Sequence, residues 1–119
     1  MRTATGHRWV GVYAVEGDHV VNLAWSGPGP PAHLRFPIGA GLTGAAIEER
    51  QTVVSNDVAN DPRYLTALDT TGSEMIVPVL AGGRVVGTLD VESDRTGAFA
   101  DEDRAELERV ARELLALYA

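Results

Sequence analysis

The chain has 119 residues, 45% of them hydrophobic and 23% charged, a length and composition that predict one globular domain spanning residues 1–119. The formal net charge is −7 and the ten basic residues are all arginines scattered along the chain, so neither a nucleic acid nor an anionic membrane surface is expected as a partner. No apolar run approaches the roughly 20 residues that span a bilayer. Without cysteine the chain has no disulfide, thiol nucleophile or thiolate metal site, and a cytoplasmic location is expected.

The first half of the chain predicts a β-hairpin followed by irregular segments. Residues 8–15 and 19–26 are rich in β-branched and aromatic residues, and a short turn centred on Gly17 separates them. Two glycines and three prolines in residues 27–31 forbid regular structure there. Three short elements are expected next: a helix over 45–50, a strand over 52–55, and a helical turn from Asp61 through Leu68.

The second half predicts another hairpin and a long helix. Residues 74–81 and 84–93 form the hairpin, and Pro78 belongs at an edge or a bulge because it has no N–H to donate. A helix over 102–118 follows, with Asp101 as its N-cap. Its buried stripe is expected to be Leu107, Val110, Ala111, Leu114 and Tyr118. Consecutive hairpins predict an antiparallel sheet, and this helix is the main candidate to cover it.

Side chains along strand 84–93 alternate between two faces. The apolar set, expected to meet the helix, is Val85, Gly87, Leu89 and Val91. The opposite set, which becomes acidic toward its end, is Val86, Thr88, Asp90 and Glu92. Glu74 joins the acidic set only if the hairpin contains a three-residue loop or a bulge, since a plain two-residue turn places Met75 beside Asp90.

Two interpretations of the acidic face stay open. Charged residues are mostly exposed, so the carboxylates could form a solvated sheet face. Alternatively they form an anionic pocket for an ammonium group, because close carboxylates raise one another's pKa unless a cation lies among them. Metal binding is the weaker reading, because a carboxylate trio without a defined loop is poorly specific. No metal site, no cofactor and no nucleophile–base pair are predicted.

Three segments together resemble the GAF domain family, over about residues 9–117. They are FPIGAGLTGAAIEERQTVVSNDVANDPRY, SEMIVPVLAGGRVVGTLDVES and FADEDRAELERVA. The resemblance implies an α+β fold like that of GAF and PAS domains: a central antiparallel sheet with helices on one face and a loop-covered ligand pocket on the other.

Within that family the second segment, followed by FADED, is most similar to the free methionine-(R)-sulfoxide reductases. Those enzymes use active-site cysteines, and this chain has Thr43 at one such position and the run TALDTTG around another. A hydroxyl cannot replace a thiolate in attacking a sulfoxide. The resemblance also implies that Glu74, Asp90 and Glu92 grip a ligand amino group, with Glu92 standing where the reductases generally have Asp.

The sequence therefore predicts a sensory, signal-transducing GAF domain that binds a small molecule and has no catalytic activity. The expected ligand is amine-bearing, and the candidate ligand-binding residues are Glu74, Asp90, Glu92, Thr88, Thr43 and Tyr64. An aromatic core role is the alternative for Tyr64. Two other functions stay open: a degenerate or divergent member of the reductase lineage, and a structural dimerisation module with a vestigial pocket.

The C-terminal helix is expected to build part of a homodimer interface. GAF domains usually begin with a helix that packs beside the C-terminal one, and the residues before Val10 show no helical periodicity, so that first helix is expected to be absent. Leu115 and Leu117 flank the buried stripe, and an exposed apolar patch of this kind usually marks an interface. The alternative is a wide stripe absorbed wholly by the domain's own sheet.

Overall fold

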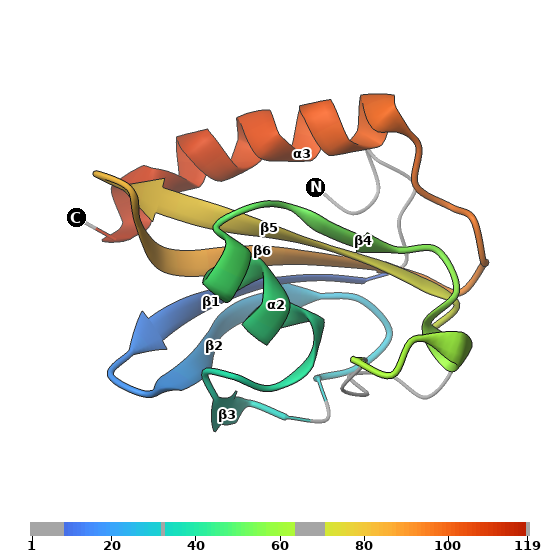
Figure 1. Ribbon diagram of the computed structural model, residues 1–119, viewed down its shortest axis with the longest axis horizontal. Helices are drawn as coiled ribbons and strands as arrows, with labels where there is room; N and C mark the ends of the chain where they lie inside the picture. The colour runs from blue at the N-terminus through green and yellow to red at the C-terminus, as the bar shows by residue number, and fades with distance from the viewer. Residues whose placement is uncertain (1–8, 32, 64–70, 119) are drawn as a thin grey trace.

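One six-stranded sheet organises the computed structural model, which describes residues 9–31, 33–63 and 71–118 (Figure 1). The strands are β1 (Trp9–Glu16), β2 (His19–Ser26), β3 (Arg35–Pro37), β4 (Val53–Ser55), β5 (Ser73–Ala81) and β6 (Arg84–Ser93). The helices are α2 (Gly41–Glu49) and α3 (Asp101–Leu114), with 3-10 turns η1 (Val58–Asn60) and η2 (Leu115–Tyr118). The strand order is β3-β2-β1-β6-β5-β4 and every pairing is antiparallel, which confirms the predicted α+β class.

Both predicted hairpins form. The turn between β1 and β2 contains Gly17 at φ 62°, and the turn between β5 and β6 contains Gly82 at φ 59° and Gly83 at φ 81°. A side chain is disfavoured in this left-handed region, so glycine is the residue that closes each turn without strain. β1 and β6 pair with each other and bring the two hairpins into one sheet.

β3 and α2 differ from the sequence prediction, and the helix predicted to residue 118 ends at Leu114 and continues as the 3-10 turn η2. β3 was not predicted, yet Phe36 pairs with Val20 and buries its ring against Tyr13, with ring centroids 5.8 Å apart. Burial of that one aromatic ring stabilises β3. The strand has three residues, so its sequence is too short to show an alternating pattern. α2 begins at Gly41 instead of residue 45, because Leu42 and Ala46 both turn into a buried cluster.

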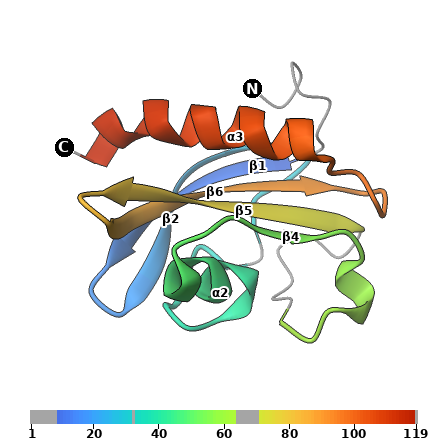
Figure 2. The same ribbon diagram turned by 45° about the horizontal axis from the view of Figure 1, so that its top comes forward.

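α3 covers one face of the sheet along its length (Figure 2). Leu107 and Ala111 are buried there against Met75, Val77 and Leu89. The helix N-cap is Ala100 and not Asp101, because the Asp103 side chain accepts the Ala100 N–H at 2.8 Å and so draws the start of the helix one residue back. The predicted stripe is otherwise confirmed, with Val110, Leu114 and Tyr118 half-buried at its edges.

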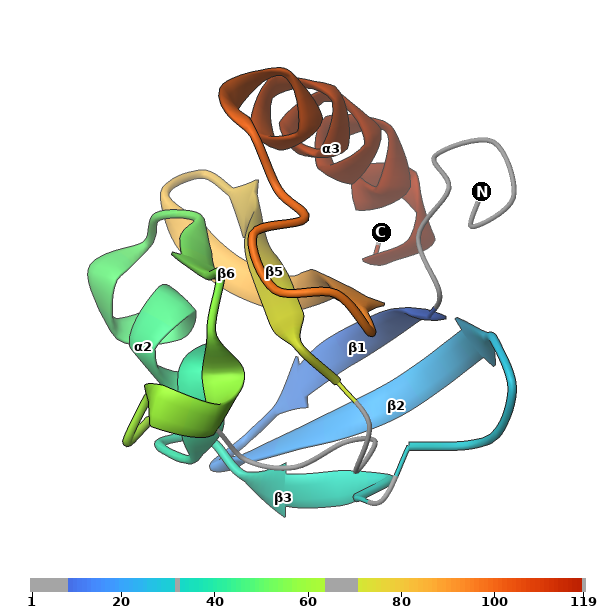
Figure 3. The ribbon, with the colours of Figure 1, turned by 90° about the vertical axis from the view of Figure 1, so that its right-hand side faces the viewer.

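α2 lies on the opposite face, so the helices are divided between the two sides of the sheet (Figures 2 and 3). Its residues Leu42 and Ala46 pack with Val53, Val58 and Ile76. This differs from the expectation of helices on one face only. The physical reason is that Leu42 and Ala46 bury their apolar side chains against Ile76, which lies on that face of β5.

Some predictions lie outside the described residues. These are the absence of a helix before Val10, most of the helical turn from Asp61 through Leu68, and the position of Tyr64. Among the described helices, none combines the length and the apolar character that crossing a membrane requires. The cytoplasmic location stays a prediction.

Candidate functional site

The register between β5 and β6 brings the acidic residues together. A bulge between Val79 and Leu80 shifts the pairing, so that Glu74 lies directly opposite Glu92. This is the arrangement that the sequence predicted for a bulged hairpin. Val86 is the extra residue of the bulge and packs against the α3 side, so its predicted place on the acidic face is wrong.

Strand β1 completes this face with two aromatic side chains. Trp9 pairs with Glu92 and Tyr13 pairs with Thr88, and directly paired residues project to the same face of a sheet. Between them Gly11 pairs with Asp90. The face on the α2 side therefore combines carboxylates on β5 and β6 with an aromatic wall on β1.

The carboxylates are buried. The exposed fraction is 5% for Glu74, 4% for Asp90 and 0% for Glu92, and Thr88 is also fully buried. This excludes the interpretation of a solvated sheet face. Burying ionised carboxylates costs free energy unless they are paired or protonated, so this cluster has a cost to the fold that a ligand could offset.

Thr43 reaches the cluster from α2. Its Oγ1 donates to Asp90 Oδ2 at 3.1 Å, and Thr71 Oγ1 donates to Glu92 Oε1. The second oxygen of Asp90, Oδ1, is buried and has no hydrogen-bond partner among the described residues. A buried acceptor without a donor is a place where a ligand N–H would gain a hydrogen bond.

Burial and mutual repulsion hold these groups toward their neutral forms. Desolvation, then the charges of Glu92 and Asp90, raise the pKa of Glu74 well above its usual value. Burial is also the main cause that raises the pKa of Asp90 to about 7, against a smaller opposing effect of the hydrogen bond from Thr43. Burial, followed by the charges of the three carboxylates, raises the pKa of Tyr13. No ion pair involves Glu74 or Asp90 in the part of the chain described.

The sequence reasoning missed the aromatic wall. Trp9 is fully buried, its Nε1 donates to the Gly29 carbonyl oxygen at 3.0 Å, and its ring lies over Gly11. A Cβ on Gly11 would lie 2.2 Å from the Trp9 ring and 3.0 Å from the Tyr13 ring, so only glycine fits between them. The signal was the spacing of Trp9, Gly11 and Tyr13 on alternate positions of one strand, which places all three on one face.

Of the six predicted ligand-binding residues, the structure brings five together. They are Thr43, Glu74, Thr88, Asp90 and Glu92. Tyr64 lies outside the described residues. Within the described ranges, no group of three His, Cys, Asp or Glu side chains has a geometry suited to a metal ion. The arrangement suits a cation that brings its own N–H donors, which is an ammonium group.

Residues 2–115 match the family described as GAF domain. The chain belongs to this family. The free methionine-R-sulfoxide reductase of Escherichia coli (strain K12) is 30% identical to this GAF domain over 112 residues, covering 92% of this chain and 66% of the enzyme. The chain spans 65–66% of the length of such curated relatives.

Solved structures agree. The type II free methionine-R-sulfoxide reductase of Thermoplasma acidophilum is 33% identical with a TM-score of 0.89, covering 94% of this chain and 79% of that one. The enzyme from Neisseria meningitidis, solved in complex with its substrate, is 32% identical with a TM-score of 0.89, covering 98% of this chain and 70% of that one.

These relatives contradict the prediction of a domain without catalytic activity. Proteins about 30% identical over most of this GAF domain are enzymes. The prediction was based on the absence of cysteine from the 119 residues. The absence of cysteine excludes attack on a sulfoxide by a thiolate of these 119 residues. It does not exclude that the chain belongs to a lineage of enzymes.

Proposed function

We propose that this GAF domain is a divergent member of the free methionine-R-sulfoxide reductase lineage that binds a free amino acid of the methionine sulfoxide type. The ammonium group of the ligand lies between Glu74, Asp90 and Glu92. Its side chain lies toward Trp9 and Tyr13. The observation that carries the proposal is the burial of Glu74 and Asp90 without an ion pair among the described residues.

Charge complementarity supports an amine. An ammonium group supplies up to three N–H donors, and Asp90 Oδ1 is a buried acceptor that lacks one. The cation would also lower the pKa values that burial has raised and favour the ionised carboxylates. The similar enzymes act on free methionine-R-sulfoxide, as their names state, and this substrate carries a free amino group.

The source of electrons differs from a thiol-bearing enzyme. Sulfoxide reduction to the sulfide needs two electrons and two protons, and the oxygen leaves as water. Since no residue of the 119 is a cysteine, the proposal assigns both electrons and both protons to an external dithiol, which becomes a disulfide. The chain contributes binding and orientation of the sulfoxide.

Calorimetric titration with L-methionine-(R)-sulfoxide tests the binding. Asp90→Asn and Glu74→Gln remove one charge each at nearly constant volume, and we expect each to weaken binding by about tenfold or more. Glu113→Gln is the matched control, because this carboxylate is exposed on α3 and pairs with Arg109 at 3.5 Å and with no other described residue. The N-acetylated ligand, which has no ammonium charge, should fail to bind.

Equal binding by the N-acetylated and free amino acids would overturn the ammonium site. Turnover is measured separately, as dithiol-dependent formation of methionine followed by mass spectrometry. Binding without turnover above the dithiol-only rate would overturn the external-dithiol step, and it would leave ligand sensing as the function of the site.

Ligand sensing is the second candidate function. The observation that favours it is that the residues needed to bind an amine are assembled and buried in a chain without a thiol. A signalling role predicts that ligand changes the exposure of a surface segment. Amide hydrogen exchange with and without ligand tests this, and exchange unchanged outside the site would count against it.

A further inference from the structure

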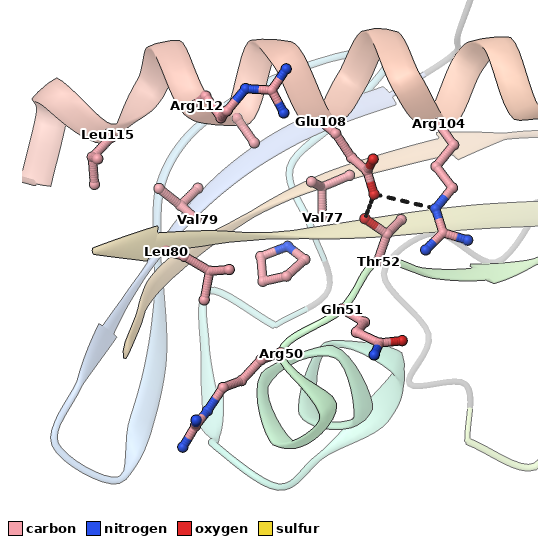
Figure 4. A pocket seen from close by; sticks show the side chains of 12 residues that line it. Arg50, Gln51, Thr52, Val77, Val79, Leu80, Arg104, Glu108, Arg112 and Leu115 are labelled. Carbon is pink, nitrogen blue, oxygen red and sulfur yellow. Dashed lines mark hydrogen bonds and ion pairs between the residues drawn. The ribbon is translucent and has the colours of Figure 1, made fainter. Parts of the chain in front are cut away.

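A second candidate site lies on the other side of β5, between that strand and α3. It is a groove with a volume of about 520 Å³, bounded by the end of β5, by α3 from Arg104 onward and by the connection from α2 to β4 (Figure 4). Volumes of this size are typical of small-molecule sites. None of the carboxylates of the amine site lines it.

The groove exists because β4 is short. β4 pairs with β5 only from Glu74 to Ile76, so the edge of β5 beyond Ile76 has no neighbouring strand on that side. The apolar surface that the groove offers comes from the exposed Leu80 and Leu115 at its rim, because Val77, Val79 and Ala111 beneath them are at most 2% exposed.

Arginines lie along the rim of this groove, with the Arg50 side chain directed away from α3 (Figure 4). Arg104 and Arg112 come from α3, and Arg50 comes from the end of α2 on the opposite bank (Figure 4). Arg104 pairs with Glu108 at 3.2 Å, whereas the side chains of Arg50 and Arg112 make no ion pair in the described ranges. The lining thus holds three positive charges and one negative charge, in a chain whose net charge is −7.

One end of the groove is closed. Thr52 Oγ1 donates to Glu108 Oε2 at 2.5 Å, and this bond joins the start of β4 to α3 across the groove (Figure 4). An extended peptide cannot run past this bridge. Strand addition to the free edge of β5 is also disfavoured, because Pro78 has no N–H to offer a partner strand. A compact ligand fits this shape better than a polypeptide.

We propose that this groove binds a small amphipathic monoanion, such as a medium-chain carboxylate. The apolar chain of the ligand packs between the exposed side chains of Leu80 and Leu115. The Arg112 guanidinium binds the carboxylate, and Arg50 adds positive charge from the opposite bank. This site and its ligand are independent of the amine site and of the function proposed for it.

Octanoate below its micellar concentration is the probe, measured by calorimetric titration and by amide chemical shifts. We expect saturable binding that perturbs the amides of Val77, Val79 and Ala111. Arg50→Gln with Arg112→Gln should weaken it by about tenfold, because a charge-assisted hydrogen bond and a nearby charge are lost. Arg109→Gln, on the exposed side of α3 and paired with Glu113, should bind octanoate unchanged. Judged by the amide shifts at the groove, octylammonium and 1-octanol should bind there at least about tenfold more weakly than octanoate.

Three outcomes would overturn the proposal. The first is no saturable binding of octanoate, or an octylammonium titration that shifts the amides of Val77, Val79 and Ala111 as strongly as octanoate does. The second is a double variant that binds as well as Arg109→Gln. The third is a different occupant. If the protein sediments with phosphatidylglycerol vesicles and does not bind octanoate, the groove belongs to a membrane surface. If the Arg50→Gln, Arg112→Gln variant has a different oligomeric mass in solution from the natural chain, the groove belongs to a second copy of the chain.

Discussion

Strand β6 buries two opposite kinds of chemistry on its two faces. Leu89 and Val91 turn toward α3 and Asp90 and Glu92 turn toward α2, and all four side chains are at most 4% exposed. On the α3 face burial is favourable in itself, because apolar surface leaves water. On the α2 face burial is unfavourable for the ionised groups. The comparison indicates that the α3 face stabilises the fold and that the α2 face carries the binding site at some cost to stability.

Asp90→Asn should show that cost most strongly. The unfolded chain releases the Asp90 proton near its ordinary pKa of 3.8, whereas the folded protein holds it up to about pH 7. Since the folded state binds more protons between these values, its stability falls as pH rises from about 4 to about 7. The difference corresponds to as much as about 4 kcal/mol. The ligand-free Asn variant should therefore be more stable than the natural chain at pH 8 and close to it at pH 4.

Urea denaturation at both pH values measures this. Asn keeps an oxygen that can accept from Thr43, so the variant removes the charge and little else. Glu113→Gln again serves as the control and should leave the pH dependence in place. An Asn variant that is less stable than the natural chain at pH 8 would show that the Asp90 carboxylate is well solvated or paired in the folded protein, contrary to the comparison.

Leu107→Ala tests the α3 face. Leu107 is 1% exposed and packs in the main apolar cluster, so truncation leaves a cavity and should reduce the free energy of unfolding by about 3 kcal/mol. Unlike the Asp90 effect, this loss should be the same at pH 4 and pH 8. Among the described residues of that cluster only Tyr118 titrates, and burial raises its pKa to about 12. A loss below about 1 kcal/mol, or a strong pH dependence, would contradict the division of roles between the faces.

Tyr118 connects the two faces. Its Oη donates to the Tyr13 carbonyl oxygen at 2.5 Å, and Gly87 leaves room for it, since a Cβ there would lie 2.4 Å from Tyr118 Oη. Tyr118→Phe should lower the free energy of unfolding by about 1 kcal/mol through the lost hydrogen bond. Affinity for the amino acid should not change, because the Tyr13 ring on the α2 face is untouched. A weakened affinity would show that the faces are coupled through this bond.

The sequence predicted most of this fold because alternation and turn glycines mark both hairpins. It also predicted that a bulge would bring Glu74 opposite Glu92, although it could not choose between a bulge and a plain turn. β3 depends on the burial of Phe36 by residues far along the chain, which no local pattern records. Burial of the carboxylates was equally hidden, because an alternating acidic strand looks the same whether water or α2 covers it.

The site on the α2 face was predicted in part, for a related reason. Five of its residues were predicted from the acidic strand and from the resemblance to the GAF family. Their polar side chains are easy to notice in a sequence because they occur among apolar residues. Trp9 and Tyr13 did not stand out, since aromatic residues in a strand are most often core residues. The groove beside α3 depends on β4 ending early, which only the pairing register shows.

The smallest effect on stability is expected at Leu117, where the α3 side of the molecule meets solvent. Leu117 is 65% exposed and does not line the groove, so Leu117→Ser should change the free energy of unfolding by less than about 0.5 kcal/mol. The homodimer predicted from the C-terminal helix gives this residue a different role, because an exposed apolar side chain beside Leu115 would be covered by a partner. Light scattering at micromolar concentration should then show a dimer for the natural chain and more monomer of 12.7 kDa for the variant. Leu23→Ser is the matched control, since Leu23 is 49% exposed on β2. A natural chain that stays monomeric on concentration would end the dimer prediction, and equal dissociation by both variants would move the interface away from the helix.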